Sequence, residues 1–130
     1  MRIVSEGSLY ILVPVAFAIL FLWLGLWPIA IAFGLLAAFM AFFFRDPSRQ
    51  PPSDANIVVS PADGRVTRVS ALDEATETSS TLVSIFLSPF DVHINRAPIA
   101  GEITSVSYMR GKFLIATSEK ASLMNEQNVL

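Results

Sequence analysis

The residues of this chain best suited to chemistry lie in the segment Ser88-Pro-Phe-Asp-Val-His-Ile-Asn-Arg96, called here the histidine segment. It contains the only histidine of a sequence that has no cysteine. An imidazole changes its charge near neutral pH, so His93 is the natural candidate for a proton donor or acceptor. The alternative is a structural histidine bonded to a strand or turn, because catalytic residues are few in any protein.

A second polar turn, Ser60-Pro-Ala-Asp-Gly-Arg-Val66, precedes the histidine segment between two apolar runs, and we predict that both turns form one composite site. Asp91 is two residues before His93, so in a regular strand both side chains would point to the same face. Its carboxylate could then orient the imidazole. The alternative for Asp91 is a cap on the turn that follows Pro89.

An apolar block from residue 9 to residue 44 contains no Asp, Glu, Lys, Arg or His. An uncharged apolar run longer than about 18 residues indicates a membrane span. One helix over the whole block would be about 54 Å long, whereas the hydrocarbon core is about 30 Å thick. Gly25, Trp27 and Pro28 interrupt the middle of the block. We therefore predict a transmembrane hairpin of two short helices, 9–26 and 29–44.

Arginines flank the apolar block on both sides, with Arg2 before it and Arg45 and Arg49 after it. The positive-inside rule then places both termini in the cytoplasm and the hairpin in the cell (inner) membrane, so the following domain faces the cytoplasm. The alternative is a secretory signal cleaved after Ala30-Ile31-Ala32, which matches the small-residue cleavage pattern. Cleavage there would leave a bare apolar N-terminus, which favours retention.

Composition divides the chain into three parts: a membrane-anchoring hairpin (1–44), a Pro-rich linker (45–56) and a β-rich domain (57–130). The fold class is therefore α+β. Runs of Val, Ile, Thr and Phe predict strands at 57–59, 66–69, 82–87, 93–97 and 103–108. Polar residues predict an exposed hairpin loop at 73–80, and residues 120–128 a short helix. The net charge of −2 gives no indication of nucleic acid binding, and no metal site is predicted.

Several motifs, in this order and spacing, resemble the phosphatidylserine decarboxylase family in its short bacterial and archaeal form. The resemblance covers essentially the whole chain and implies a lipoyl-like (barrel-sandwich) catalytic domain, of which residues 57–130 would be the N-terminal part. The motifs are Phe-Phe-Arg45-Asp-Pro after the apolar block, Ser60-Pro-Ala-Asp-Gly-Arg-Val, Ser88-Pro-Phe-Asp-Val-His-Ile-Asn-Arg-Ala-Pro98, Gly101, Gly111-Lys-Phe and Asn125-Glu.

The resemblance implies a proenzyme that cuts itself before a serine and converts that serine into a pyruvoyl group. This group forms a Schiff base with the amine of phosphatidylserine. Loss of CO2 and protonation then yield phosphatidylethanolamine. The family's serine lies in a Gly-Ser motif near the C-terminus, whereas this chain contains only Gly7-Ser8. We therefore expect a C-terminally truncated proenzyme, inactive without its missing C-terminal segment (the α chain). A naturally divided or inactive relative is the alternative, and the sequence leaves open whether the protein is a homodimer.

The resemblance also assigns roles to single residues. His93 would donate the proton after CO2 leaves, and Asp63 would help a histidine to activate the serine for self-cleavage. The alternative for Asp63 is a turn-forming role before Gly64. Many relatives carry a second histidine three residues after the first, where this chain has Arg96. That departure leaves the self-cleavage base open and makes Arg96, with Asn95 beside it, a candidate for binding the substrate's phosphate or carboxylate.

A membrane-anchored, lipoyl-like adaptor of the efflux-pump membrane fusion type is the alternative function. Such adaptors bind partners, catalyse nothing, and share the membrane segment, the Pro-rich linker and the Ser-Pro-x-Asp-Gly-x-Val turn. They also insert a long heptad-rich helical hairpin, and no stretch after Arg65 shows sustained heptad periodicity. The decarboxylase resemblance is therefore the favoured interpretation.

Overall fold

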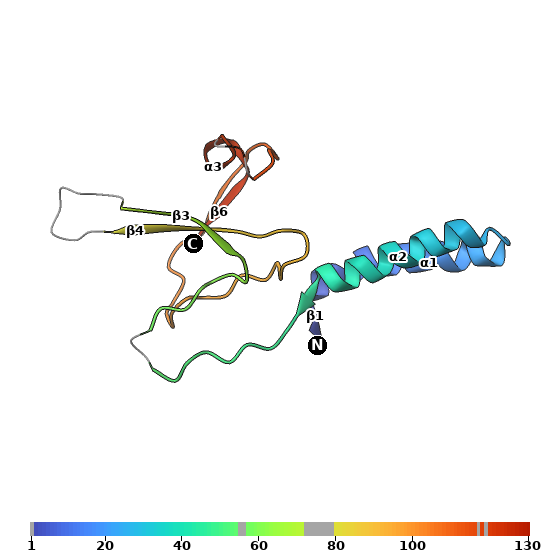
Figure 1. Cartoon of the computed structure of the whole chain (residues 1–130), viewed down its shortest axis with the longest axis horizontal. Coiled ribbons are helices and arrows are strands. Elements are labelled where there is room, and N and C mark those ends of the chain that lie inside the picture. Colours follow the sequence, from blue (N-terminus) through green and yellow to red (C-terminus); the bar gives the residue numbers. More distant parts are fainter. Residues whose placement is uncertain (1, 55–56, 72–79, 117, 119) are drawn as a thin grey trace. The chain divides into compact units, whose positions relative to one another are not determined.

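The computed structural model describes residues 2–54, 57–71, 80–116, 118 and 120–130. The elements divide between two compact units, Met1–Pro98 and Ile99–Leu130, and their mixture of helices and antiparallel sheets confirms the α+β class. In chain order they are β1 (Arg2–Ile3), η1 (Ser5–Gly7), α1 (Ser8–Trp23), α2 (Trp27–Phe43), β2 (Arg45–Asp46), β3 (Arg65–Ala71), β4 (Thr81–Phe86), β5 (Ser107–Met109), α3 (Ala121–Met124) and β6 (Gln127–Val129) (Figure 1).

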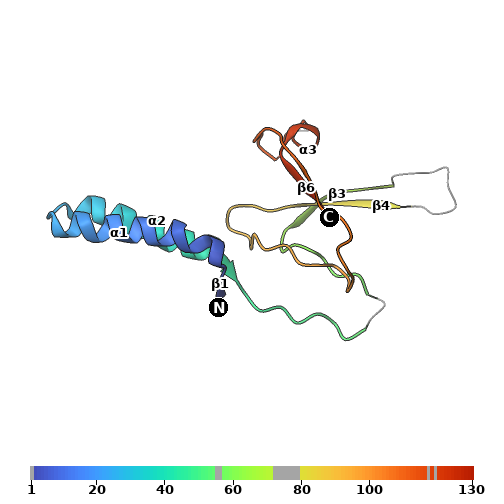
Figure 2. The same ribbon diagram turned by 180° about the vertical axis from the view of Figure 1, so that it is seen from behind.

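Helices α1 and α2 run side by side as a hairpin, which both views of the ribbon show (Figures 1 and 2). Gly25 lies in the connection with a φ of 75°, a left-handed conformation that glycine adopts without a Cβ penalty. Pro28 stands in the first turn of α2, where a missing N–H costs no helical hydrogen bond. The predicted interruption is therefore present, with helix bounds that differ by up to three residues from 9–26 and 29–44.

Small residues and aromatic rings pack the two helices together. Ala30 and Ala37 of α2 are buried, and side chains of this size let two helix backbones come close. The ring of Phe33 stacks against Phe17 and Phe21 of α1, with centroid distances of 5.2 and 5.5 Å. These contacts fix the pairing of the helices along the half of the hairpin nearest its loop.

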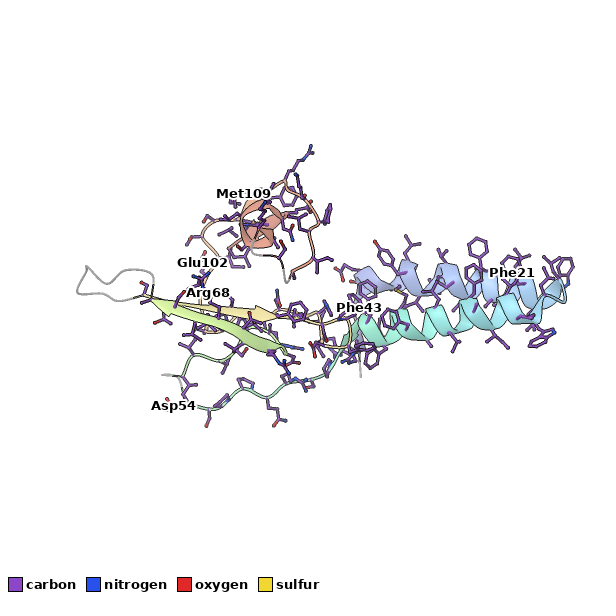
Figure 3. The ribbon with its side chains drawn as sticks, turned by 45° about the horizontal axis from the view of Figure 1, so that its top comes forward. Phe21, Phe43, Asp54, Arg68, Glu102 and Met109 are labelled. Atoms are coloured by element: carbon purple, nitrogen blue, oxygen red, sulfur yellow. The ribbon has the colours of Figure 1, made fainter. Side chains whose placement is uncertain are left out.

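The outer surface of the hairpin is apolar. Leu12, Leu22 and Leu35 are each more than 60% exposed. Figure 3 shows side chains projecting along both helices, with Phe21 near the loop and Phe43 at the opposite, open end. By length and composition Ser5–Trp23 can cross a membrane, and Trp27–Phe43 is a shorter apolar helix. Such a surface suits lipid better than water, although the placement of the hairpin in a bilayer stays a prediction.

The described strands form three separate two-stranded antiparallel sheets, β1–β2, β3–β4 and β5–β6. In the longest, β3 pairs with β4 from Arg65 opposite Phe86 to Ala71 opposite Thr81, with an irregularity between Val66 and Arg68. The predicted strands 66–69 and 82–87 are thereby confirmed. The predicted loop at 73–80 lies almost wholly outside the described residues. A lipoyl-like barrel-sandwich stays a prediction, because these sheets are separate.

The strands predicted at 57–59 and 93–97 are wrong, since neither segment forms a ladder. The Val59 N–H donates instead to the carbonyl of Pro98, just after the second segment, at 3.0 Å. Prolines cannot donate to a ladder, and Pro61 and Pro98 flank these two runs. The other predictions were too long: only the end of 103–108 pairs, in β5, and the helix at 120–128 is reduced to α3, followed by β6.

In the unit Ile99–Leu130, Asn125 joins two segments. Its side-chain oxygen accepts from the Leu114 N–H at 2.7 Å, and its side-chain nitrogen donates to the Leu114 carbonyl at 2.8 Å. Gly111 lies against the backbone of Asn125, so a Cβ at this position would overlap it. The hydrogen bond from Tyr108 to Glu126 raises the tyrosine's pKa. The hydrogen bonds of Asn125 to Leu114 and the close approach of Gly111 to Asn125 therefore bring the motifs at 111–113 and 125–126 together.

Candidate functional site

The two polar turns predicted to form a composite site are adjacent in the structure. Asp63 forms an isolated antiparallel bridge with Val92, and the Arg96 N–H donates to the Pro61 carbonyl at 2.9 Å. Val92 is only 4% exposed, and it is one of the few buried apolar side chains among the described residues. The histidine segment is therefore fixed against the turn that contains Asp63.

A cavity of about 440 Å³ lies between the two turns. Gly64 lets the first turn approach β4 closely, because a Cβ there would overlap the Phe86 carbonyl oxygen and lie 2.9 Å from a side-chain carbon of Ile85. Both carboxylates singled out in the sequence line this cavity, which we call the carboxylate cavity. Its lining residues are Asp63, Gly64, Arg65, Phe86, Ser88 and Asp91.

The Asp91 carboxylate caps the turn at the start of the histidine segment. It accepts hydrogen bonds from the Ser88 N–H and the Ser88 hydroxyl, each at 2.8 Å. These two bonds lower the pKa of Asp91, the backbone bond most, and the positive charges of His93 and Arg45 act in the same direction. Asp91 is therefore ionised at neutral pH, and these contacts match its interpretation as a turn cap.

The half-buried His93 ring is held at its edge and at its face. Nδ1 lies 3.1 Å from the backbone carbonyl of Asp91. Because a carbonyl can only accept, Nδ1 carries the hydrogen and Nε2 is the nitrogen left for proton exchange. The ring face stacks on Phe43, the last residue of α2, with a centroid distance of 4.2 Å. The Asp91 backbone and the end of the hairpin, rather than a carboxylate, orient this imidazole.

Arg45 ties the same segment to the hairpin. Its guanidinium donates to the Phe90 carbonyl at 2.7 Å and to the Phe42 carbonyl at 2.8 Å. It also lies over the Phe42 ring, 3.7 Å from the centroid. Sequence reasoning assigned Arg45 only a topological role and assigned Phe43 none. The signal that could have found them is the motif Phe-Phe-Arg45-Asp-Pro directly after the apolar block.

Two ion pairs connect the linker to the polar turns. Arg96 Nη2 lies 2.5 Å from the Asp46 carboxylate and also donates to the Pro47 carbonyl at 3.0 Å. Arg49 donates to the Asp63 carboxylate from Nη2 at 2.6 Å and from Nε at 3.1 Å, which raises the pKa of Arg49. Asp63 thus faces an arginine here and not His93.

The predicted site residues fall into three groups. Asp63 and Asp91 line the carboxylate cavity, and His93 contacts the backbone of Asp91 beside it. Arg96 lines a different cavity, together with Arg2 and Asp46. Asn95 is exposed.

Comparisons with known proteins agree with this set of motifs. The family model described as phosphatidylserine decarboxylase matches residues 36–130. A phosphatidylserine decarboxylase proenzyme from Solibacter usitatus is 46% identical over 130 residues, covering 100% of this chain and 61% of the relative. One from Symbiobacterium thermophilum is 45% identical, covering 98% and 60%. One from Nitratidesulfovibrio vulgaris is 47% identical over 105 residues, covering 80% and 48%.

The chain therefore spans about 60% of the length of the first two relatives. No solved structure matches it significantly.

Proposed function

The chain belongs to the phosphatidylserine decarboxylase family, and we propose that it forms the membrane-bound part of an enzyme that converts phosphatidylserine into phosphatidylethanolamine and CO2. The observation that carries the proposal is the stacking of His93 on Phe43 at the open end of the apolar hairpin. If the hairpin spans the bilayer, this contact places the proton donor at the level of the lipid headgroups. A phospholipid could then react without leaving the membrane.

The hairpin is proposed to anchor the protein in the cell (inner) membrane with both ends in the cytoplasm. At 1.5 Å per residue, α1 and α2 are about 24 and 26 Å long, close to the hydrocarbon thickness of about 30 Å. Arg2 and Asp46 are paired in the β1–β2 sheet, so the flanking arginines gather at the open end. The positive-inside rule favours the cytoplasm for that end and for the catalytic domain.

The family resemblance implies a pyruvoyl group, and the carboxylate cavity fits it. At about 440 Å³ the cavity has room for a small carbonyl group, with the Asp63 carboxylate on its wall. When present, such a group supplies an electrophilic carbonyl that serves as an electron sink. The one Gly-Ser pair of this chain, Gly7-Ser8, lies at the start of α1. We therefore propose that the group-forming serine is supplied by a C-terminal segment like that of the longer relatives.

His93 is proposed to deliver the proton to the carbon atom that loses CO2. Its Nδ1–H is engaged by the Asp91 carbonyl, which directs proton exchange to Nε2. Asp91 is proposed to act indirectly, because its carboxylate is occupied by Ser88 and its backbone holds the imidazole. The stacking on Phe43 limits rotation of the ring, so Nε2 keeps one direction.

Asp63 is proposed to assist self-cleavage, and Arg96 and Asn95 to contact the substrate. Asp63 has a guanidinium partner in Arg49, so a histidine that reaches it would have to share or replace that partner. Arg96 keeps guanidinium donors beyond the one that binds Asp46, and these suit a phosphate or carboxylate. A lipoyl-like barrel-sandwich for the completed domain, and a homodimer, remain parts of the proposal.

A chimera tests the proposed function. The chain is followed by the C-terminal part of the S. usitatus relative, which the family pattern expects to carry the Gly-Ser motif. We expect the chimera to cut itself and to release CO2 from phosphatidylserine vesicles, whereas the 130-residue chain alone stays intact and releases none. The matched control is the chimera with alanine in place of the motif's serine. A correctly cleaved chimera that leaves phosphatidylserine unchanged would contradict the proposed reaction.

A further inference from the structure

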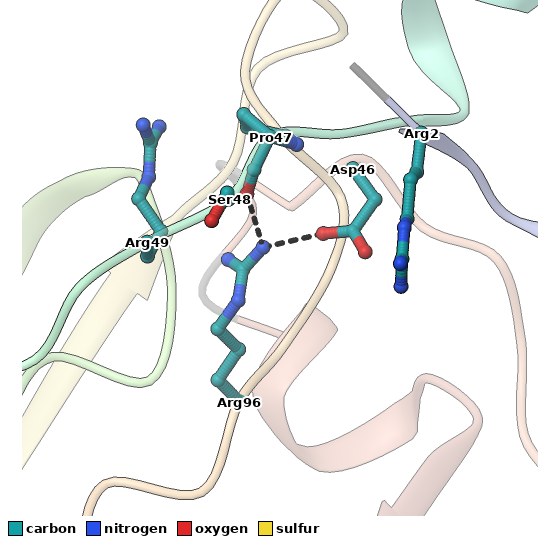
Figure 4. Close-up of a pocket in the computed structure, with 6 residues that line it drawn as sticks. All are labelled: Arg2, Asp46, Pro47, Ser48, Arg49 and Arg96. Atoms are coloured by element: carbon teal, nitrogen blue, oxygen red, sulfur yellow. Dashed lines mark hydrogen bonds and ion pairs between the residues drawn. The ribbon is translucent and has the colours of Figure 1, made fainter.

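A second cavity, of about 520 Å³, lies where the linker leaves the hairpin, and we call it the arginine cavity. It shares no lining residue with the carboxylate cavity, so it is a separate site. Half of its lining residues are arginines. The lining residues are Arg2, Asp46, Pro47, Ser48, Arg49 and Arg96 (Figure 4).

Figure 4 shows the Asp46 carboxylate between the guanidinium groups of Arg96 and Arg2. Arg96 contacts both Asp46 and Pro47 through Nη2 alone, and a guanidinium has five N–H donors. Among the described residues, Nη1 and Nε of Arg96 and the whole guanidinium of Arg2 have no hydrogen-bond partner. Several donors therefore remain for a bound anion.

The charge in and around this cavity matches one monovalent anion. Two of its three arginines are in ion pairs, Arg96 with Asp46 and Arg49 with Asp63. Arg2 is left as the excess positive charge. A guanidinium binds phosphate oxygens through paired N–H donors, and a phosphodiester carries a single negative charge.

The position of the cavity indicates where the anion comes from. Asp46 and Pro47 follow closely after Phe43, the last residue of α2, and Arg2 shortly precedes α1. If the hairpin spans the bilayer, these residues lie at the headgroup level, where lipid phosphates are the most concentrated anions. Basic residues next to membrane helices are known to attract anionic lipids.

We propose that the arginine cavity binds the phosphodiester of an anionic glycerophospholipid, between Arg2 and Arg96. This site deepens the proposed function, in which Arg96 contacts the substrate, and it rests on the membrane placement proposed above. The cavity recognises the phosphate and the net negative charge of the lipid. It does not recognise an amine. Phosphatidylglycerol, which has no amine to react, therefore binds as well as phosphatidylserine, and zwitterionic phosphatidylcholine binds less.

The test counts lipids retained by the full chain. The protein is placed in phosphatidylcholine nanodiscs with a minor fraction of phosphatidylglycerol, and native mass spectrometry measures the bound phosphatidylglycerol. We expect Arg2→Gln to lower its retention about tenfold, the scale of one charge-assisted hydrogen bond. This variant leaves both ion pairs of the cavity intact. The matched control is Arg68→Gln, which removes an equal charge from β3, and retention should not change.

Equal retention by the wild type, Arg2→Gln and Arg68→Gln would overturn the site, as would no retention by the wild type. Release of the lipid by millimolar inorganic phosphate would instead identify a site for free phosphate and overturn the lipid assignment. Flotation with phosphatidylcholine vesicles separates the two proposals. A chain that does not float contradicts the membrane placement, whereas a chain that floats but shows no dependence on Arg2 contradicts the site alone.

Discussion

The apolar hairpin and the histidine segment reach a fixed structure in different ways. Helices α1 and α2 are regular, and each is held by its own backbone hydrogen bonds and by packing against the other. The histidine segment has no regular element and is held by single contacts to residues about 30 to 50 positions away, such as Pro61 to Arg96, Arg45 to Phe90 and Asp46 to Arg96. The difference shows that the histidine segment takes its geometry from distant contacts, both with the Asp63 turn and with residues at the open end of the hairpin.

No single one of these contacts is strong. The Arg96–Asp46 pair is about one-third exposed on each side, and exposed ion pairs contribute only about 0–1 kcal/mol. The stacking of His93 on Phe43 adds roughly 0.5–1.5 kcal/mol beyond its buried area. The segment therefore depends on several contacts at once, and it should be disturbed more easily than the hairpin.

The largest expected effect is on labelling from outside the cell, because it is all or none. The chain has no cysteine, so Ser5→Cys and Ser53→Cys each introduce a single thiol. One thiol precedes the two helices in the sequence and the other follows them. Both thiols should resist an impermeant reagent in intact cells and react after lysis, since both ends are proposed to be cytoplasmic. Labelling of the thiol at position 53 in intact cells would show that the chain after the hairpin lies outside the cytoplasm, and it would refute this topology.

The next effect concerns the histidine segment alone. In the chimera, His93→Ala should lower the turnover of phosphatidylserine about 10²-fold or more, the usual scale for a positioned acid or base. Insertion and self-cleavage should persist, because the hairpin and Asp63 are unchanged. Flotation and gel analysis check both. Near-normal turnover would return His93 to a structural role and direct attention to Arg96.

The smallest effect is a pH dependence confined to the histidine segment. The Ser88 bonds lower the pKa of Asp91 below that of an unfolded aspartate, about 3.9. Such a group contributes stability that is complete above the unfolded pKa and is lost as the pH falls through the lower, folded value. Hydrogen exchange should therefore show the Ser88 amide losing protection only below about pH 4. The hairpin, whose residues 9–44 hold no Asp, Glu or His, should keep its protection.

Asp91→Asn is the matched variant, because it removes the titration and keeps the size of the side chain. Its Ser88 amide should lack the acid transition. A transition that persists in this variant would assign the pH dependence to another group.

The sequence was sufficient for the parts of the fold that depend on neighbouring residues. An uncharged run broken at Gly25 and Pro28 predicted two helices, and β-branched runs predicted the strands at 66–69 and 82–87. It also predicted that the two turns meet, but not how. The pairing of Arg96 with Asp46 joins residues 50 positions apart, and no periodicity reports such a contact. No ladder forms at 93–97, where the flanking Pro98 cannot donate and Arg96 instead makes single contacts to Pro61 and Asp46.

A double-mutant cycle between Phe43 and His93 tests most directly whether the end of the hairpin positions His93, the proposed proton donor. In the chimera, Phe43→Ala should lower decarboxylation roughly two- to tenfold, as expected from the loss of one aromatic contact. Leu35→Ala, at an exposed position of α2, should have no effect. In the His93→Ala background, Phe43→Ala should cause no further loss, because the ring it orients is gone. An equal loss in both backgrounds would contradict the account.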